Sequence, residues 1–322
     1  MPDPSVLVVV VNYRSAGLAV DCLRSLEAEV AARPGTRVVV TDNASGDGSA
    51  DALDAAVRQN GWGGWAEVRP LDTNGGFAFG NNAAIRPALA SENPPDFVWL
   101  LNPDTVVRTG ALSALLGVFE QHPDAGLVGS RLEHLDGTPQ RSWFGFPSVL
   151  GEFESSVRLR VVSRALAARV LTDDPPTQAT PVDWVAGASL MVRRAVFEAV
   201  GLLDETYFMY FEEVDFCLKA RRAGWKCWYA PASRVVHLVG QSSGVTDPKT
   251  LAQKRRPAYW VHARRHFFVT NHGILRTFLA DAAWASGFLL WRLRKALKRE
   301  AISEPKLLFW DFCRFNFLMA KR

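Results

Sequence analysis

The sequence predicts an α/β protein with a mostly parallel, Rossmann-like sheet and a basic helical appendage. Continuous β-branched runs recur through the first 130 residues, which is typical of strands buried on both faces. Each run is followed by a segment with helical spacing, and this alternation favours a parallel sheet. The appendage is predicted by charge, because residues 254–322 hold 15 Lys/Arg against 4 Asp/Glu. The remainder, with 22 basic and 29 acidic residues, is mildly acidic.

The elements of the first half follow from these two periodicities. The expected strands are Ser5–Asn12, Thr36–Asn43, Ala66–Leu71 and Asp96–Thr105. The expected helices between them are Leu18–Val30, Gly48–Asn60 and Phe77–Ala90.

The second half is less regular. Residues Ser130–Ser148 are rich in turn formers and are expected to be antiparallel strands or loop, and Leu171–Pro181 is expected to be a mobile loop. Further elements are expected from local patterns: a strand over Gly187–Arg194, a helix over Val214–Gly224 with Gly224 as its C-cap, short strands over Lys226–Pro231 and Arg234–Leu238, and helices after Lys254.

Composition excludes several classes of protein. With 48% hydrophobic and 22% charged residues among 322, the chain is expected to be globular rather than disordered. The four cysteines form no C-x-x-C pair, which argues against a zinc site and suits a reducing compartment. Met1–Ser5 lacks a basic segment, so no signal peptide is expected. No P-loop or G-x-G-x-x-G fingerprint occurs, which argues against a P-loop NTPase and a dinucleotide oxidoreductase. The excess of basic residues is confined to the tail and no recognised module appears, so nucleic-acid binding is not expected.

Polar residues follow three of the predicted parallel strands, at Asn12-Tyr13, at Asp42-Asn43 and at Asn102-Pro103-Asp104. Ligands of open parallel sheets bind beyond the carboxyl ends of the strands, so a site is expected there. The loop Thr73–Asn82 has glycines and precedes a helix, which suits a phosphate. Each signal also has a structural interpretation, since Asp42 could be an Asx-turn residue and "NPD" a plain turn.

Three carboxylates stand within four residues of "YFMYFEEVDFCLKARRAGW", directly behind an aromatic run. Glu212, Glu213 and Asp215 could include a general base, or they could form a solvated first turn of a helix.

The ordered set "VVVVNYRSAG", "VVVTDNASGDGS", "NGGFAFGNN", "VWLLNPDT", "GASLMVRR", "YFMYFEEVDFCLKARRAGW" and "RVVH" resembles the family-two glycosyltransferases of GT-A fold, particularly bacterial rhamnosyltransferases. The matches span Val8 to His237, about three quarters of the chain. The resemblance implies α/β/α layers and a catalytic domain over residues 1–250. Residues 1–130 would be its nucleotide-binding half, residues 131–250 its acceptor and catalytic half, and residues 251–322 a helical basic tail.

The resemblance also implies roles for particular residues. The nucleotide sugar would be bound by Val10, Asn12, Tyr13, Asp42, Asn74, Gly76, Phe77, Asn102 and Asp104. Asp42 would accept the N3–H of a uracil or thymine ring. Asp104, assisted by His237, would hold Mg²⁺ or Mn²⁺ against the donor diphosphate.

Glu213 would be the general base and Glu212 would orient the acceptor. Acceptor contacts would come from Asp183, Trp184, Gly187 and Asp215. Asp215 is also favoured at the start of a helix. Trp184 could either stack on a sugar ring or pack in the core. The sequence departs from the family in three places. Asn102 replaces a first Asp, Gly75 replaces a larger apolar residue, and Glu-Glu replaces Glu-Asp.

The implied reaction is inverting, metal-dependent transfer of a sugar from a nucleoside diphosphate to a hydroxyl of a glycan or lipid-linked glycan in cell-envelope polysaccharide synthesis. L-Rhamnose from dTDP-rhamnose is the favoured donor sugar, and UDP-hexoses or UDP-galactofuranose stay open. Other classes also stay open: a non-catalytic nucleotide-sugar or glycan-binding subunit, or a sugar-nucleotide pyrophosphorylase, although its G-x-G-T-R loop is absent.

The tail is expected to contact an anionic membrane surface, so the enzyme would be cytoplasmic and peripheral on the inner face of a bacterial plasma membrane. Asp281–Glu300 contains an apolar run of about a dozen residues, short of the roughly 20 needed to span a bilayer. The expected interfacial anchors are Trp284, Trp291, Phe309 and Trp310. The alternative is a helical hairpin packed on the catalytic domain or forming a homodimer.

Overall fold

The computed structural model describes residues 3–165, 175–238, 255–301 and 304–318. The chain divides into two units. Unit 1 comprises Met1–Phe144, Asp174–Phe208 and Glu212–Gly244, and unit 2 comprises Gly145–Asp173, Met209–Phe211 and Val245–Arg322. The expected loop at Leu171–Pro181 falls partly outside the described residues, and its end enters a short strand, β8 (Thr180–Val182).

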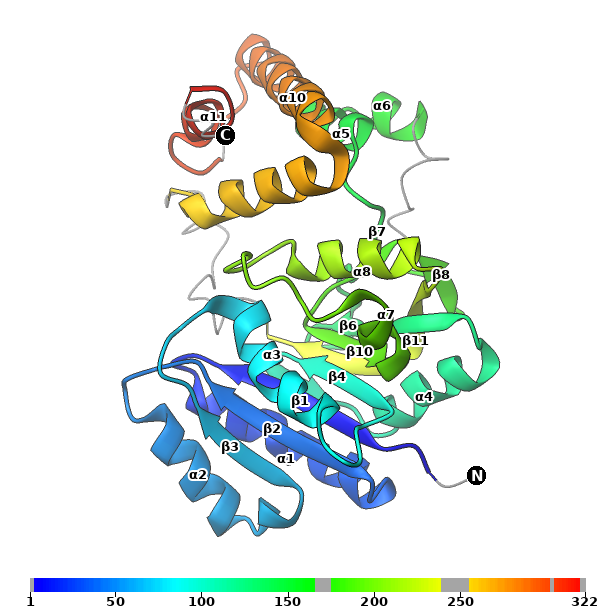
Figure 1. Ribbon diagram of the computed structural model, residues 1–322. Coiled ribbons are helices and arrows are strands. Elements are labelled where there is room, and N and C mark those ends of the chain that lie inside the picture. The colour runs from blue at the N-terminus through cyan, green and yellow to red at the C-terminus, as the bar shows by residue number, and fades with distance from the viewer. Residues whose placement is uncertain (1–2, 166–174, 239–254, 302–303, 319–322) are drawn as a thin grey trace. The chain divides into compact units, whose positions relative to one another are not determined.

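The N-terminal strands of unit 1 form the parallel part of the sheet (Figure 1). They are β1 (Val6–Asn12), β2 (Thr36–Asp42), β3 (Ala66–Pro70) and β4 (Phe97–Leu101). The order is β3-β2-β1-β4, and every pairing in it is parallel. All seven residues of β1 are buried, as the β-branched run predicts.

The rest of the sheet is mixed. Its strands are β5 (Thr105–Val107), β6 (Ala125–Glu133), β8, β10 (Ser189–Arg193) and β11 (Lys226–His237). β10 runs antiparallel to both β4 and β6, whereas β11 runs parallel to β6 and antiparallel to β5 and β8. A separate two-stranded sheet pairs β7 (Trp143–Phe144) with β9 (Trp184–Val185).

Residues 226–238 were expected to form two short strands, but β11 is continuous. Its register against β6 shifts between Ala230 and Arg234, around Pro231. Because Pro cannot donate to a ladder, it is tolerated at such an irregularity, and the local pattern looks like two strands.

Helices cover both faces of this sheet, which gives the expected α/β/α layers (Figure 1). The helices are α1 (Ala16–Ala32), α2 (Ser49–Gln59), α3 (Gly76–Leu89), α4 (Ala111–Gln121), α7 (Arg194–Val200) and α8 (Glu212–Arg222). The buried residues of α1, α2 and α4 join the side chains of Val6, Val8 and Val10 in one apolar core. On the other face, α3 packs closely enough that a Cβ on Gly80 would meet the Val11 side chain at 2.6 Å.

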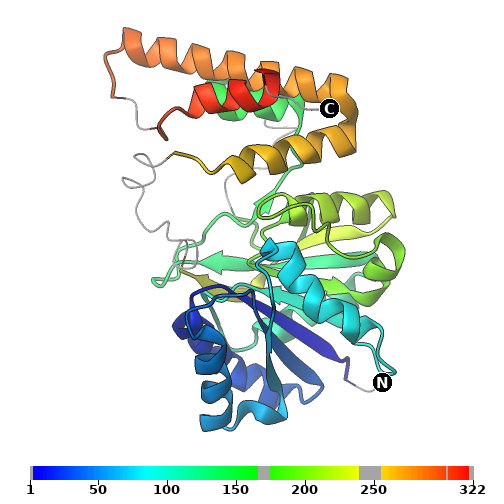
Figure 2. The ribbon, with the colours of Figure 1, turned by 60° about the vertical axis from the view of Figure 1, so that its left-hand side comes forward.

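Unit 2 is helical. It contains α5 (Val149–Val157), α6 (Arg160–Ala165), α10 (Ala258–Leu297) and α11 (Leu308–Cys313). Figure 2 shows α10 as two arms that meet in a bend, and the non-helical backbone of Gly273 (φ 79°, ψ 168°) lies at this bend. Arg264 of the first arm, only 1% exposed, pairs with Asp281 of the second arm at 2.5 Å and with Glu152 of α5 at 3.0 Å.

Two of the predicted membrane anchors are wrong. Trp284 and Trp291 are only 9% and 4% exposed, and they form an apolar core with Phe288 and with Leu308 and Phe312 of α11. Phe309 packs against this core, whereas Trp310 is 54% exposed. The sequence shows that tryptophans recur on the helix, but which face packs against α11 depends on tertiary contacts.

Among the described residues, no helix combines the length and the apolar character that crossing a bilayer requires.

Candidate active site

Asn12 and Asp42 end neighbouring parallel strands and are direct partners in the β1–β2 register. Asn12 Nδ2 donates to Asp42 Oδ1 at 2.6 Å, and Ser45 Oγ donates to the same oxygen at 2.6 Å. The backbone N–H of Ser45 donates to Asp42 Oδ2 at 3.1 Å. Asp42 thus binds the chain three residues on rather than the two of an Asx turn, and this local structural role is compatible with a binding role.

The two side chains differ in what they can still bind. Asn12 is fully buried, its amide group donates to Asp42 and Ser45, and its oxygen accepts two hydrogen bonds from Ser15. The carboxylate of Asp42 accepts three hydrogen bonds and has about four acceptor positions, so one position on Oδ2 is left for a ligand. Asn12 can orient Asp42, whereas Asp42 can contact a ligand.

Val10 and Tyr13 flank Asn12 in different environments. The Val10 side chain is fully buried in the core, so only its backbone could border a nucleobase. Tyr13 is 37% exposed, and the guanidinium carbon of Arg14 lies 5.1 Å from its ring centroid. Arg14 also donates through Nε to the Ser45 carbonyl at 3.0 Å. The exposed face of this strand end is thus aromatic and cationic.

The glycine loop is tied to the end of β2 through Asn43. Asn43 Nδ2 donates to Asn74 Oδ1 at 2.9 Å and to the Gly76 carbonyl at 3.0 Å, and Gly76 N–H donates to Asn74 Oδ1 at 3.0 Å. Phe77 N–H donates to the carbonyl of Phe208 at 3.0 Å. The predicted residues Asn74, Gly76 and Phe77 are therefore joined both to the β2 end and to the segment before α8.

Gly76 has two reasons to be glycine. Its φ of 88° lies in the left-handed region, and a Cβ there would lie 1.8 Å from the Phe208 carbonyl oxygen. Gly75 next to it leaves room for the Phe79 ring, which a Cβ would meet at 2.4 Å. The small residue that departs from the family pattern is thus matched by local packing.

Gly76→Ala is expected to lower the free energy of unfolding by about 3 kcal/mol or more, through strain and a backbone clash. Gly110→Ala is the matched control, because Gly110 has a φ of 86° but nothing within 4 Å of its Cβ position. The control should lower it by only about 1–2 kcal/mol. Urea denaturation of both variants measures the difference, and equal losses would mean that the Phe208 contact is unimportant.

Asp104 and His237 are brought together from residues 133 apart. β5 and β11 run antiparallel with His237 opposite Thr105, and Asp104 directly precedes that strand. Asp104 Oδ1 lies 3.5 Å from His237 Nε2, and the carboxylate is only 1% exposed. Asn102 is partly exposed at the end of β4, where its N–H donates to the Ala188 carbonyl at 3.0 Å.

Asp104 and His237 are placed so that both could be ligands of one divalent cation. Two ligand atoms of one octahedral ion at about 2.1 Å lie about 3 Å apart, close to the observed separation. A buried carboxylate and an imidazole are suitable donors for Mn²⁺ or Mg²⁺. Within the described part of the chain, no cluster of three or more His, Cys, Asp or Glu could hold a metal ion. The remaining ligands would have to be diphosphate oxygens and water.

Glu212 and Glu213 open helix α8 in different environments. Glu212 is 4% exposed, and its Oε2 has no hydrogen-bond partner among the described residues. Burial raises the pKa of Glu212 well above its usual value, and the charge of Glu213 raises it further. Burial also raises the pKa of Glu213, but backbone N–H groups of Glu213, Gly187 and Val214 stabilise its anion and oppose the shift.

Glu213 is therefore the member of the pair that ionises first. Glu213 as a residue is half-buried whereas Glu212 is buried, although Glu213 Oε2 is itself enclosed and has no hydrogen-bond partner among the described residues. Glu212 stays protonated to a higher pH than Glu213. Tyr210 and Phe211, the two residues before the pair, both have φ in the left-handed region (72° and 71°). Such strain in bulky residues is concentrated at functional sites.

Asp215 has a structural partner. It lies in the first turn of α8, 1% exposed, and pairs with Lys219 one turn later at 2.7 Å. It was expected at the start of the helix, but the helix begins three residues earlier, at Glu212.

Of the predicted acceptor residues in β9 and the following turn, Gly187 lies nearest to the acids. A Cβ on Gly187 would lie 3.6 Å from Glu213 Cβ and 3.4 Å from the Phe77 ring. Asp183 instead pairs with Arg221 at 2.6 Å, and Trp184 stacks on Phe144 with centroids 4.3 Å apart. Gly187 thus lies between Phe77, in the loop Thr73–Asn82, and the candidate base Glu213.

Sequence reasoning missed Ser45 and Phe208 as site-building residues. Ser45 follows Asp42 by three positions, where its N–H and hydroxyl can both donate to the Asp42 carboxylate, and a Ser at this spacing after an Asp could have indicated it. Phe208 contributes only its carbonyl, for which no side-chain signal exists.

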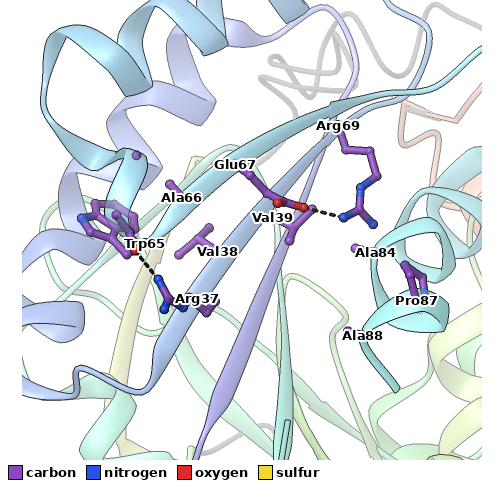
Figure 3. A pocket seen from close by; sticks show the side chains of 12 residues that line it. Arg37, Val38, Val39, Trp65, Ala66, Glu67, Arg69, Ala84, Pro87 and Ala88 are labelled. Atoms are coloured by element: carbon purple, nitrogen blue, oxygen red, sulfur yellow. Dashed lines mark hydrogen bonds and ion pairs between the residues drawn. The ribbon is translucent and has the colours of Figure 1, made fainter. Parts of the chain in front are cut away.

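A groove of about 390 Å³ lies between the edge strands and α3 (Figure 3). Its charged side chains are already engaged, since Arg69 pairs with Glu67 and Arg37 donates to the Gly64 carbonyl. None of the predicted site residues lines it, so it is not the candidate active site.

Comparison with known proteins identifies the family of the chain. Residues 2–260 match the family model described as Glycosyltransferase like family 2. The chain is 30% identical over 271 residues to a Mycobacterium tuberculosis protein named N-acetylglucosaminyl-diphospho-decaprenol L-rhamnosyltransferase, covering 81% of this chain and 80% of the relative. It is 30% identical over 168 residues to rhamnosyltransferase WbbL of Escherichia coli, covering 50% of this chain and 60% of the relative.

A solved structure resembles the fold. Mannosyltransferase PcManGT from Pyrobaculum calidifontis, in complex with GDP-Man and Mn²⁺, matches with a TM-score of 0.56 and 16% identity, covering 100% of this chain and 90% of that one. The fold is that of a GT-A glycosyltransferase, as predicted. The chain belongs to the glycosyltransferase like family 2, and it is a glycosyltransferase.

Proposed function

We propose that the protein transfers L-rhamnose from dTDP-L-rhamnose, with inversion, to a hydroxyl of a lipid-linked glycan. One observation carries the catalytic part of this proposal. A Cβ on Gly187 would lie 3.4 Å from the Phe77 ring and 3.6 Å from Glu213 Cβ, so the half-buried Glu213 and the loop Thr73–Asn82 both approach Gly187, which supports a base close to the loop proposed to bind the donor. A carboxylate in this position can deprotonate an acceptor hydroxyl next to the anomeric carbon.

The reaction would be a single displacement. As Glu213 takes the hydroxyl proton, the acceptor oxygen forms a bond to the anomeric carbon while the bond from that carbon to the diphosphate oxygen breaks. Glu212, whose pKa is raised by burial and by the charge of Glu213, would in its protonated form donate a hydrogen bond and help to orient the acceptor. Attack on the face opposite the leaving group gives inversion.

Asp104 and His237 would hold the divalent cation, Mg²⁺ or Mn²⁺, against the diphosphate. When bound, the cation would offset the charge that develops on the leaving diphosphate. Asn102, at the partly exposed end of β4, would contact the ribose.

The donor and acceptor are proposed from the relatives. Two of them are named rhamnosyltransferases, and the name of the mycobacterial protein specifies a decaprenyl-diphosphate-linked acceptor. Such an acceptor would place the enzyme at the cytoplasmic face of a membrane, in cell-envelope glycan synthesis. UDP-hexoses and UDP-galactofuranose are the alternative donors, and a thermal-shift panel of nucleotide sugars with Mn²⁺ tests the choice, because a ligand that binds the folded state raises its melting temperature.

Asp42→Ala is expected to weaken dTDP or UDP binding by about 1.5–3 kcal/mol, the range for a hydrogen bond to a charged group. The reason is the free acceptor position on Asp42 Oδ2, which suits the N3–H of a pyrimidine ring. Titration calorimetry with dTDP and with GDP measures the effect.

GDP is the matched control for this variant. The wild type should prefer dTDP, and the variant should lose affinity for dTDP far more than for GDP. Equal affinity of the wild type for the two nucleotides would show that Asp42 does not recognise the base.

A further inference from the structure

The second arm of α10, residues 274–297, exposes large apolar side chains, of which Phe278 also meets the ring of Phe317 edge-on with centroids 6.0 Å apart. Eight of them are between 47% and 77% exposed. They are Ile274, Leu275, Phe278, Leu279, Leu289, Leu290, Leu293 and Leu297. On a water-facing helix these positions would ordinarily be polar.

These eight residues form one continuous band, here called the apolar stripe. At about 100° per residue they fall within an arc of about 160°, and the arm is about 36 Å long. The buried residues of the arm, including Trp284, Phe288 and Trp291, lie on the opposite side, against α11. The stripe is thus a second apolar face, additional to the one that stabilises unit 2.

Arginines border the stripe on both edges. Arg292 lies about 90° from the centre of the stripe on one side, and Arg276 lies about 110° from it on the other. Both are exposed. An apolar face with basic residues along its margins is the pattern of a helix that lies in the plane of a membrane interface.

We propose that the apolar stripe of α10 binds the surface of an anionic lipid bilayer, with the helix parallel to the membrane plane. The arm cannot insert across the bilayer, because its other face contains the buried Asp281–Arg264 ion pair. Lying flat, it would place the stripe among the acyl chains and its arginines among the headgroups, where anionic lipids attract them.

Charge argues for lipid rather than a second copy of the chain. A two-fold dimer through the stripe would bring the same face of both copies together, so its arginine margins would face one another. Within 274–297 the only acidic residue is Asp281, which is 1% exposed and already paired, so no carboxylate is offered to these arginines. Anionic headgroups supply the missing charge.

This proposal deepens the proposed function by naming the surface that would bring the enzyme to a lipid-linked acceptor. Its test uses neither donor nor acceptor, so the two proposals can fail separately.

The experiment is flotation of the full-length protein with vesicles of phosphatidylcholine alone or mixed with phosphatidylglycerol. The wild type should bind the mixed vesicles, and binding should weaken as salt is raised. Leu290→Asp with Leu293→Asp should lower the bound-to-free ratio by about tenfold or more, because charges would enter the acyl region. Arg276→Glu with Arg292→Glu should remove the preference for anionic vesicles.

Leu135→Asp is the matched control. Leu135 is 73% exposed in unit 1, between β6 and β7, and its replacement should leave vesicle binding unchanged. Leu290→Ala with Leu293→Ala gives a milder second variant, and thermal melting shows that each variant is folded.

Three results would overturn the proposal. The first is a folded wild type that binds neither vesicle. The second is an equal loss of binding in Leu135→Asp. The third is a wild-type dimer by light scattering that the Leu290/Leu293 variants convert to monomer without a change in vesicle binding, which would assign the stripe to a second copy.

Discussion

Glu213→Gln is expected to lower the rate constant of sugar transfer by about 10²–10⁴-fold, the usual contribution of a general base. Gln keeps the shape of the side chain but cannot accept the proton of the acceptor hydroxyl. Donor affinity should change little, because the proposed nucleotide contacts lie at the ends of β1 and β2 rather than at α8. Single-turnover transfer and donor titration on the same preparation measure the two quantities.

Glu212→Gln is the matched control. Burial and the neighbouring charge raise the pKa of Glu212 and so favour its protonated form, which an amide resembles, and we therefore expect less than a tenfold loss of rate. Asp215→Asn should leave the chemistry intact and lower stability instead, since a carboxylate that is 1% exposed would lose its ion pair with Lys219. Near-native transfer by Glu213→Gln together with a large loss in Glu212→Gln would show that Glu212, not Glu213, is the base.

The same carboxylates predict the direction of the pH dependence. Because burial raises the pKa of Glu213, the base becomes protonated, and transfer slows, at a higher pH than for an ordinary glutamate. Stability has the opposite trend. A pKa raised in the folded state stabilises the protein at low pH, and that stabilisation is lost as pH rises through the folded value. Urea denaturation at increasing pH, from below the usual pKa of a glutamate upward, should show this loss of stability in the wild type and a smaller loss in Glu212→Gln.

The first half of the fold was predictable because its strands are buried on both faces. A strand such as Val6–Asn12 has only apolar residues until its last position, so its extent and its polar end are both visible in the sequence. The second half was not predictable in the same way. The antiparallel insertion of β10 between β4 and β6 depends on pairing with distant strands, which the local pattern of Ser189–Arg193 does not encode.

The candidate site was likewise predictable only in part. Asn12 and Asp42 could be placed together because parallel neighbours end at one edge of a sheet. The pairing of Asp104 with His237 was expected only from the resemblance, since no spacing rule relates residues so far apart. The order of ionisation of Glu212 and Glu213 required their burial and the backbone N–H groups that surround them.

Asp104→Ala is expected to reduce sugar transfer to the level of wild-type enzyme in excess EDTA. The buried carboxylate is the anionic protein ligand of the proposed cation, and the imidazole of His237 alone would hold a divalent ion weakly. Added Mn²⁺ at ordinary concentrations should not restore the variant. The cation should raise the melting temperature of the wild type in the presence of dTDP, and this increase should disappear in Asp104→Ala.

Asp51→Ala and His237→Ala separate metal binding from a general loss of charge. Asp51 is exposed on α2, so its replacement should change neither transfer nor the Mn²⁺-dependent melting shift. His237→Ala keeps the carboxylate, so we expect partial activity that rises with Mn²⁺ concentration, because a weaker site fills when more metal is supplied. If transfer were undiminished in excess chelator and Asp104→Ala still failed, Asp104 would act by positioning the end of β4 and β5, and the cation would have no part in the reaction.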